Sequence, residues 1–474
     1  MSQQPGLRVL AIRPPPAEQT IRMDRAMCCE PLELEYLYTV LTDPQRGPVH
    51  TVALWDGLIE RGSPLSTARR LGADVVLFTA HITNVPAVLA MARAMKKDLQ
   101  PPPHIFIGGV HAEVVPEHLY DPAVDGVLYA DALEGITRLL GRLQRGEDYR
   151  QLPGCAFPDG QGGWIENPGP VLEPAGLPVP KRPLLAQHPE RYKTMYFQPC
   201  ASVKTAFGCP GPCTFCFCAR MHGGGYGPRP IQAVVDEIAA LDTPSVFIVD
   251  DNFLTSPERV AEFCAAMRES GITKRLIAYG TADFVARHPE LMAELRGVGL
   301  EALIVGFEFV TDDELEAVHK RARAADNAAA IARCKALDIE LFSLFMANPA
   351  WHHRDFARMA WWIVRQGLCF ATFSTLTVLP GTTMARQQAA RQDAPLPPVE
   401  GLWRYDLLRL HQQPTHMSAA GFYLWLFLLY MLPGLRFRTG WTILRRYGLW
   451  GGVEFVVESV WTGLEFLWKL WRWR

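Results

Sequence analysis

The string Gly208-Cys209-Pro-Gly-Pro-Cys213-Thr-Phe-Cys216 decides how this chain of 474 residues is interpreted. It directly follows Ser202–Phe207, a short apolar segment that is typical of a β-strand. Three thiols at spacings of four and three residues fit a compact loop around an iron–sulfur cluster. Three cysteines leave one iron of a [4Fe–4S] cluster without a protein ligand. The string therefore predicts an open iron that can bind and reduce a small molecule.

A zinc site is the alternative interpretation of the same cysteines. Structural zinc sites usually have four protein ligands, and Cys218 could supply the fourth. The chain has 11 cysteines, which are scattered outside this one cluster. A secreted disulfide framework is denser and more regular, so the pattern indicates metal or redox chemistry in a reducing compartment.

The overall composition is that of a globular enzyme. Hydrophobic residues make up 49% of the chain and charged residues 20%. The net charge of −2 gives no overall basic field that would attract nucleic acid. Residues 1–12 lack the basic start and the long apolar core of a signal peptide, so we expect a cytoplasmic protein.

The first part of the chain alternates apolar segments with helical patterns. The expected strands are Leu7–Ile12, Val49–Trp55, Val75–Thr79, His104–Gly108 and Asp125–Tyr129. This alternation predicts a doubly wound α/β domain over residues 1–148, with its ligand at the carboxyl ends of the strands. Residues 149–195 are rich in Pro and Gly, which predicts a linker that could contain one hairpin.

A second alternation begins near Ser202. The expected strands are Ser202–Phe207, Ser245–Val249, Arg275–Tyr279, Ala302–Val305, Ile339–Met346 and Ala371–Val378, with helical segments between them. Six strand–helix units predict a partial (β/α)6 barrel over residues 196–390, with its chemistry on the loops that follow the strands. Residues 391–474 predict a helical, apolar and aromatic-rich C-terminal region.

The cysteine string resembles the radical S-adenosylmethionine (SAM) superfamily, because the aromatic Phe215 precedes the last cysteine of C-x3-C-x2-C. The resemblance covers roughly residues 195–385. It implies that Cys209, Cys213 and Cys216 hold a [4Fe–4S] cluster whose open iron chelates SAM. Cleavage of SAM then yields a 5′-deoxyadenosyl radical.

The same resemblance implies contacts to SAM from polar residues at the ends of later strands. The implied contacts are Phe215, Asp250, Asp251, Asp283 and Glu308. Leu379-Pro-Gly-Thr382 also resembles the "PGT" turn of a subfamily. Ala347–Trp351 departs from the Gly-Pro-Gly-Glu-like turn that the superfamily often has, so the adenine end of the SAM site is expected to be built differently.

Residues 5–145 resemble the cobalamin-binding domain that precedes the barrel in one large radical SAM class. The matching strings are Thr79-Ala-His81 and Gly108-Gly109-Val-His111, in which small residues let the backbone approach the cofactor. Thr79, Gly108 and Gly109 are therefore the expected cobalamin contacts. The Asp-x-His-x-x-Gly signature for a cobalt-binding histidine is absent. A domain that has kept the fold and lost the cofactor is the alternative.

The C-terminal region combines tryptophan with basic charge. Six of the 13 tryptophans lie in Trp441–Trp473, and the segment from Gly434 onward carries seven Lys or Arg and three Glu. An apolar stripe at helical spacing runs over Val453, Val456, Val457, Val460, Trp461, Leu464, Leu467, Trp468 and Trp471. These features predict a helix at a membrane surface, and a helix packed on the barrel or a dimer contact is the alternative.

The whole layout is similar to radical SAM enzymes of the anaerobic magnesium-protoporphyrin ester cyclase type and to hopanoid and bacteriochlorophyll methylases. The resemblance implies an apolar substrate, either an isoprenoid lipid or a tetrapyrrole, and a reducing electron donor such as flavodoxin or ferredoxin. Our leading hypothesis is C-methylation, in which the radical abstracts a hydrogen and cobalamin delivers the methyl group. Oxidative cyclisation without methyl transfer, or a non-catalytic metal-binding or sensor protein, are the alternatives.

Overall fold

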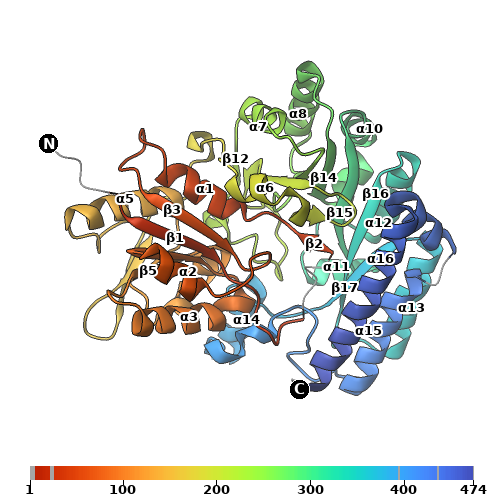
Figure 1. Cartoon of the computed structure of the whole chain (residues 1–474). Helices are drawn as coiled ribbons and strands as arrows, with labels where there is room; N and C mark the ends of the chain where they lie inside the picture. Colours follow the sequence, from red (N-terminus) through yellow and green to blue (C-terminus); the bar gives the residue numbers. More distant parts are fainter. Residues whose placement is uncertain (1–5, 22–25, 393–394, 435–436, 473–474) are drawn as a thin grey trace.

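The computed structural model describes residues 6–21, 26–392, 395–434 and 437–472. Two largely parallel β-sheets lie next to each other, and two long C-terminal helices, α15 (Ala419–Gly434) and α16 (Phe437–Arg472), flank the second sheet (Figure 1). The α/β fold class expected from the sequence is confirmed, with a doubly wound domain before a partial barrel.

The first sheet has the strand order β3-β1-β4-β5-β6-β7-β8. Its five parallel strands are β1 (Arg8–Arg13), β3 (Thr51–Asp56), β4 (Val75–Thr79), β5 (His104–Gly108) and β6 (Gly126–Leu128). Helices α1 (Leu32–Leu41) and α5 (Ala132–Arg145) pack on one face, and α2 (Pro64–Leu71) and α3 (Val85–Asp98) pack on the other. This order places a topological switch between β1 and β4, where such sheets bind ligands.

The segment expected to be a linker contributes two strands to the first sheet. β7 (Cys155–Pro158) pairs antiparallel with β6, and β8 (Trp164–Asn167) pairs with β7. The sheet therefore extends past residue 148, because the apolar run at β7 buries Phe157 completely against the sheet. The one hairpin that the sequence allowed here is thus present, but the loop-like composition of its short strands and Gly-rich turn gives no sign that it joins the sheet.

The second sheet is parallel throughout, in the order β10-β13-β14-β15-β16-β17. Its strands are β10 (Cys200–Val203), β13 (Ser245–Ile248), β14 (Arg275–Gly280), β15 (Leu300–Glu308), β16 (Glu340–Ala347) and β17 (Phe370–Thr375). The helices between them include α7 (Ile231–Ala239), α8 (Pro257–Ser270), α10 (Pro289–Gly297), α12 (Ala324–Ala336) and α13 (His353–Gln366). Helix α8 begins as its sequence predicts, because the Ser256 side chain accepts a hydrogen bond from the Arg259 N–H.

The first strand of the barrel is shorter than Ser202–Phe207, the expected range. It ends at Val203, and Ala206–Phe207 forms a separate strand, β11, that pairs antiparallel with β12 (Gly227–Pro228). The break arises because the backbone N–H groups of Thr205 and Ala206 donate to the Asp250 carboxylate instead of to a neighbouring strand.

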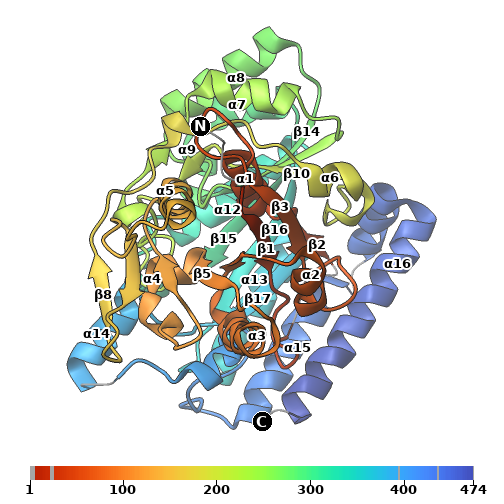
Figure 2. The ribbon, with the colours of Figure 1, turned by 60° about the vertical axis from the view of Figure 1, so that its left-hand side comes forward.

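Helices α15 and α16 run side by side along the barrel, as the turned view shows (Figure 2). Helix α16 is bent at Gly448, whose φ is 71°. Near its end, the Lys469 Nζ donates to the Thr20 carbonyl at 2.6 Å, which ties the helix to the first domain. Within the described residues, no single helix has the length and apolar character to cross a membrane, whereas Ala419–Gly434 and Thr439–Val453, bent by 69°, pass that test as a pair.

A buried ion-pair network joins the two domains. Arg182, which precedes α6 (Pro183–Gln187), pairs with Glu30 of the first domain and with Glu237 on α7 of the barrel. Arg229 also pairs with Glu237, at 2.7 Å. The side chains of all four residues are at most 9% exposed. One guanidinium thus bridges carboxylates from both halves of the molecule.

Substitution Arg182→Met is expected to destabilise the protein by about 3–5 kcal/mol, because it leaves the buried Glu30 carboxylate without its cation. The free energy of unfolding in urea measures the effect. The matched control is Arg268→Met, since Arg268 and Glu294 form an exposed pair (57% and 41% exposed) and should change stability by at most about 0.5 kcal/mol. Equal effects of the two substitutions would show that the network does not join the domains.

Candidate functional site

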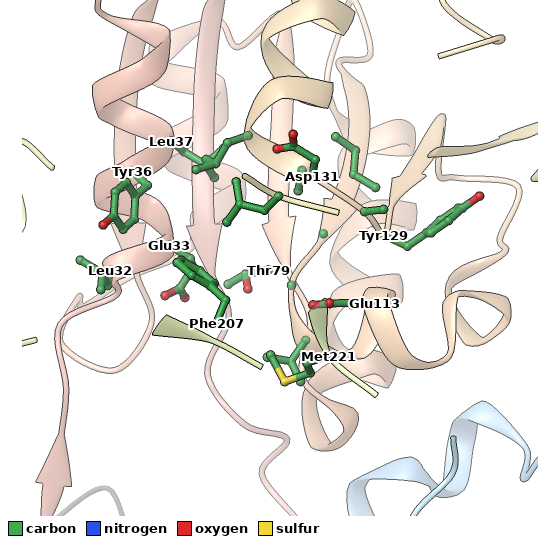
Figure 3. Close-up of a pocket in the computed structure, with 18 of the residues that line it drawn as sticks. Leu32, Glu33, Tyr36, Leu37, Thr79, Glu113, Tyr129, Asp131, Phe207 and Met221 are labelled. Carbon is green, nitrogen blue, oxygen red and sulfur yellow. The ribbon is translucent and has the colours of Figure 1, made fainter. Parts of the chain in front are cut away.

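A cavity of about 740 Å³ lies where the carboxyl ends of the two sheets face each other. Thr79 at the end of β4 and Gly108 at the end of β5 line it from the first domain. Phe207, Gly208 and Met221 line it from the barrel. Figure 3 shows Phe207 and Met221 on barrel segments that face Thr79 and Glu113 of the first domain. Both domains therefore contribute to a single site.

The floor of the cavity on the first domain is made of closely packed backbone. The Ala80 N–H donates to the Gly108 carbonyl at 2.8 Å, and the His111 N–H donates to the Ala80 carbonyl at 2.9 Å. Gly109 has a φ of 95°, and a Cβ atom there would lie 2.5 Å from the Thr79 Oγ1. Only glycine fits this approach, so the expected cofactor residues Thr79, Gly108 and Gly109 do lie together at the cavity.

The three cysteines of the decisive string lie beside the cavity in the loop that follows β11. Each thiol is half-buried, and Gly208, the residue before Cys209, lines the cavity. Burial raises the pKa of Cys213 to about 11 and also raises the pKa of Cys209. A hydrogen bond with the Cys218 thiol lowers the pKa of Cys216. Cys218 is thus a neighbour of the string that interacts with Cys216.

A buried ion pair, Lys320–Glu308, lies next to the cysteines. The Lys320 Nζ is 2.8 Å from the Glu308 Oε1, and Glu308 ends β15 with a φ of 61°, in the left-handed region. Burial opposes the charge of Lys320, but the charges of Glu308 and the Cys213 thiol outweigh it and raise the pKa of the lysine. The pair therefore brings a fixed positive charge to the thiols. Lys320 could not be predicted from the sequence, because a single lysine in a polar segment carries no signal of its own.

The two aspartates after β13 hold the start of the cysteine loop. Asp250 is buried and accepts the N–H groups of Thr205 and Ala206 at 2.6 and 3.1 Å. Asp251 accepts the Gly208 N–H at 3.0 Å and pairs with Lys204 at 3.3 Å. Their direct role in this structure is to position the loop, and a contact with SAM stays a prediction.

The remaining two expected residues, Asp283 and Phe215, have other partners. Asp283, in the first turn of α9 (Ala282–Arg287), pairs with Arg287 at 3.7 Å, and no contact joins it to the cysteines within the described residues. Phe215 packs its ring against the core of the barrel, which anchors the loop between Cys213 and Cys216. Their contacts with SAM also stay predictions.

The three cysteine thiols fit an iron–sulfur cluster better than a single metal ion. Over the described ranges, no group of three or more His, Cys, Asp or Glu side chains is arranged to hold one metal ion. A closed zinc site needs four ligands that converge on one point. Three half-buried thiols distributed along one loop, with a cation beside them, fit a [4Fe–4S] cluster that keeps one iron open.

Comparison with known protein families identifies the same two regions. The Radical SAM superfamily matches residues 203–361, and the B12 binding domain matches residues 20–138. A hopanoid C-3 methylase from Methylococcus capsulatus is 27% identical over 403 residues, which is 81% of this chain and 74% of that protein. An anaerobic magnesium-protoporphyrin IX monomethyl ester cyclase from Cereibacter sphaeroides is 26% identical over 57% of this chain and 46% of its own length.

Two enzymes whose solved structures contain bound cobalamin share the fold. OxsB, a cobalamin-dependent SAM radical enzyme determined with aqua-cobalamin and SAM, superposes with a TM-score of 0.70 at 14% identity, over 94% of this chain and 69% of that chain. The radical SAM methyltransferase TsrM from Kitasatospora setae, determined with cobalamin and a [4Fe–4S] cluster, gives 0.65 at 16% identity, over 81% and 78%. At these identities the likeness concerns the fold alone.

Substitution Asp250→Ala is expected to lower the free energy of unfolding by about 2–5 kcal/mol, because it leaves two buried N–H groups without an acceptor. Asp250→Asn should lose less than half of that, since its amide oxygen can still accept both N–H groups. Urea titration of the two variants and the wild type measures the difference. Equal losses in both variants would mean that the charge of Asp250, and not its position as an acceptor, holds the loop.

Proposed function

Because the chain belongs to the radical SAM superfamily and carries an N-terminal B12-binding domain, we propose that it is a cobalamin-dependent radical SAM methyltransferase acting on an apolar substrate. The observation that carries the proposal is the shared cavity. The cysteine loop of the barrel and the glycine floor of the first domain meet there, so cofactors bound by the two domains would act on one substrate.

The two matched domains imply a [4Fe–4S] cluster, SAM and cobalamin, which when bound supply a carbon-centred radical and a transferable methyl group. In this proposal Cys209, Cys213 and Cys216 hold the cluster. The Lys320–Glu308 pair offers SAM one buried cation and one carboxylate beside the thiols. The tight backbone at Gly108-Gly109 lets the cobalamin approach the first sheet.

The walls of the cavity support an apolar reaction chamber. Most of its lining is hydrophobic, including Leu37, Leu77 and Phe106 on the first domain and Phe207 and Met221 on the barrel. Such walls exclude water, which protects a radical from side reactions. Together with the long match to a hopanoid methylase, they support an isoprenoid or a similarly apolar substrate. Cyclisation without methyl transfer is the second candidate, and the magnesium-protoporphyrin cyclase match covers less of this chain.

We also propose that the C-terminal helices contact a membrane from its cytoplasmic side, where an apolar substrate would reside. The outer surface of α16 exposes large apolar side chains along most of its length: Phe437, Trp441, Leu449, Trp450, Val453, Val456, Val457, Val460, Trp461, Leu464 and Trp468. The exposed fraction is 90% at Phe437 and 83% at Trp450. Apolar surface with tryptophan and excess basic charge suits the interface of an anionic bilayer.

Cysteine variants test the cluster. After anaerobic reconstitution with iron and sulfide, the wild type and Cys218→Ala should each bind about four irons per chain, because Cys218 is not a ligand. Cys213→Ala should lose most of the iron. Metal analysis and visible absorption measure both. Equal loss of metal in the two variants would instead indicate a site with four protein ligands.

Vesicle binding tests the membrane contact. The double substitution Leu449→Ser and Trp450→Ser removes two exposed apolar side chains, so we expect at least about tenfold weaker sedimentation with vesicles containing phosphatidylglycerol. The matched control is Ile165→Ser on β8, which is 51% exposed and lies on the other domain. Unchanged binding by the double variant, or an equal loss in the control, would contradict the proposed contact.

A further inference from the structure

One imidazole at the cavity has no role in the arrangement described above. His81 follows β4 directly, on the side of the first domain, and its side chain lines the cavity and is accessible to it. The printed hydrogen bonds between His81 and η1 (Ile82–Asn84), the short helix that comes next, run through the His81 backbone: its N–H donates to the Asn84 Oδ1 and its carbonyl accepts the Asn84 N–H. The ring itself lies at the cavity.

The backbone on both sides of His81 is fixed. The preceding residue, Ala80, donates to the Gly108 carbonyl and accepts from the His111 N–H, at 2.8 and 2.9 Å. The His81 N–H itself donates to the Asn84 Oδ1 at 2.9 Å. The ring consequently projects from a rigid point at the carboxyl end of β4. Protein scaffolds hold metal ligands on rigid points of this kind.

Glu33 and Arg13 line the same cavity as His81. A carboxylate that accepts from the second ring nitrogen is a common way to orient a ligating imidazole. A neutral ring keeps one nitrogen lone pair free, and this is the form in which histidine binds metals.

The other nearby histidines are already engaged. His111 is buried, and its Nε2 lies 2.9 Å from the Nδ1 of His118. His222 lines the cavity from the barrel side, but its ring packs against Gly227, where an added Cβ would come within 2.3 Å of the His222 Nε2. Of the described cavity residues on the first domain, His81 is thus the histidine that can reach a bound cofactor.

We propose that His81 is the protein residue that would bind the cobalt of cobalamin. It would take the place of the histidine of the Asp-x-His-x-x-Gly signature, which this chain lacks after its first strand. His81 belongs to the first domain, whereas Phe207 and Met221 line the same cavity from the barrel and would face the substrate. The inference rests on the proposed use of cobalamin.

Electron paramagnetic resonance of the full-length protein tests the assignment. The protein is loaded with hydroxocobalamin, freed of excess cofactor and reduced to the Co(II) state. A nitrogen ligand splits the cobalt lines into triplets, and we expect doublets instead when all histidines carry the heavy nitrogen isotope. The isotope distinguishes a protein histidine from the cofactor's own base. His81→Ala should lose the splitting and still retain cobalamin, whereas His222→Ala should keep the splitting.

Each other outcome has a distinct meaning. Triplets that persist in the labelled protein would assign the nitrogen to the cofactor's base and overturn the inference. Labelled wild type without any splitting, or doublets that survive in His81→Ala, would also overturn it. Wild type that retains no cobalamin after gel filtration would refute the proposed use of cobalamin itself. The isotope experiment needs no variant, so triplets or unsplit lines in the labelled wild type overturn the inference even if His81→Ala folds poorly. Loss of the doublets in His222→Ala would assign the ligand to His222 and overturn it as well.

Discussion

The site depends on one buried guanidinium that holds the two sheets together. Arg182 joins Glu30, just before α1, to Glu237 on α7, and its side chain is 9% exposed. Glu30 also accepts the Ser202 N–H at 2.8 Å, inside the first strand of the barrel. Because buried charges are costly unless they are paired, this network strongly favours one relative placement of the domains. The cavity exists only in that placement, since its two walls belong to different sheets.

With the two domains held in this placement, a few local contacts decide which groups the cavity can hold. Asp250 accepts the N–H groups of Thr205 and Ala206, so the first barrel strand ends before these residues and the chain turns toward the cysteine loop. Gly109 presses the loop after β5 against Thr79. The Lys320–Glu308 pair brings a buried cation to the thiols. Each contact is local, yet together they place the thiols and the cation beside Gly208, which lines the cavity that the backbone of the first domain borders from the other side.

Much of this could be predicted from the sequence, and the exceptions have physical causes. Val75–Thr79 and His104–Gly108 are predicted to the residue, because central parallel strands are uninterrupted apolar runs. The one hairpin considered for residues 149–195 is formed by β7 and β8. Its pairing with β6 could not be predicted, because its strands are short and its turn is rich in glycine. The role of Lys320 and the left-handed backbone at Glu308 could not be predicted, because both depend on tertiary neighbours. The roles predicted for the cysteines and glycines stay predictions, but the fold shows that Gly108, Gly109 and Gly208, which precedes Cys209, line one cavity.

The most direct test of the central claim is SAM cleavage by the full-length protein. The protein is reconstituted anaerobically with iron, sulfide and hydroxocobalamin, given a strong reductant and SAM, and assayed by chromatography for 5′-deoxyadenosine. The account predicts that the wild type forms the nucleoside and that Cys213→Ala forms none. Wild type that carries a complete cluster and bound cobalamin, yet forms no more nucleoside than the variant, would contradict it.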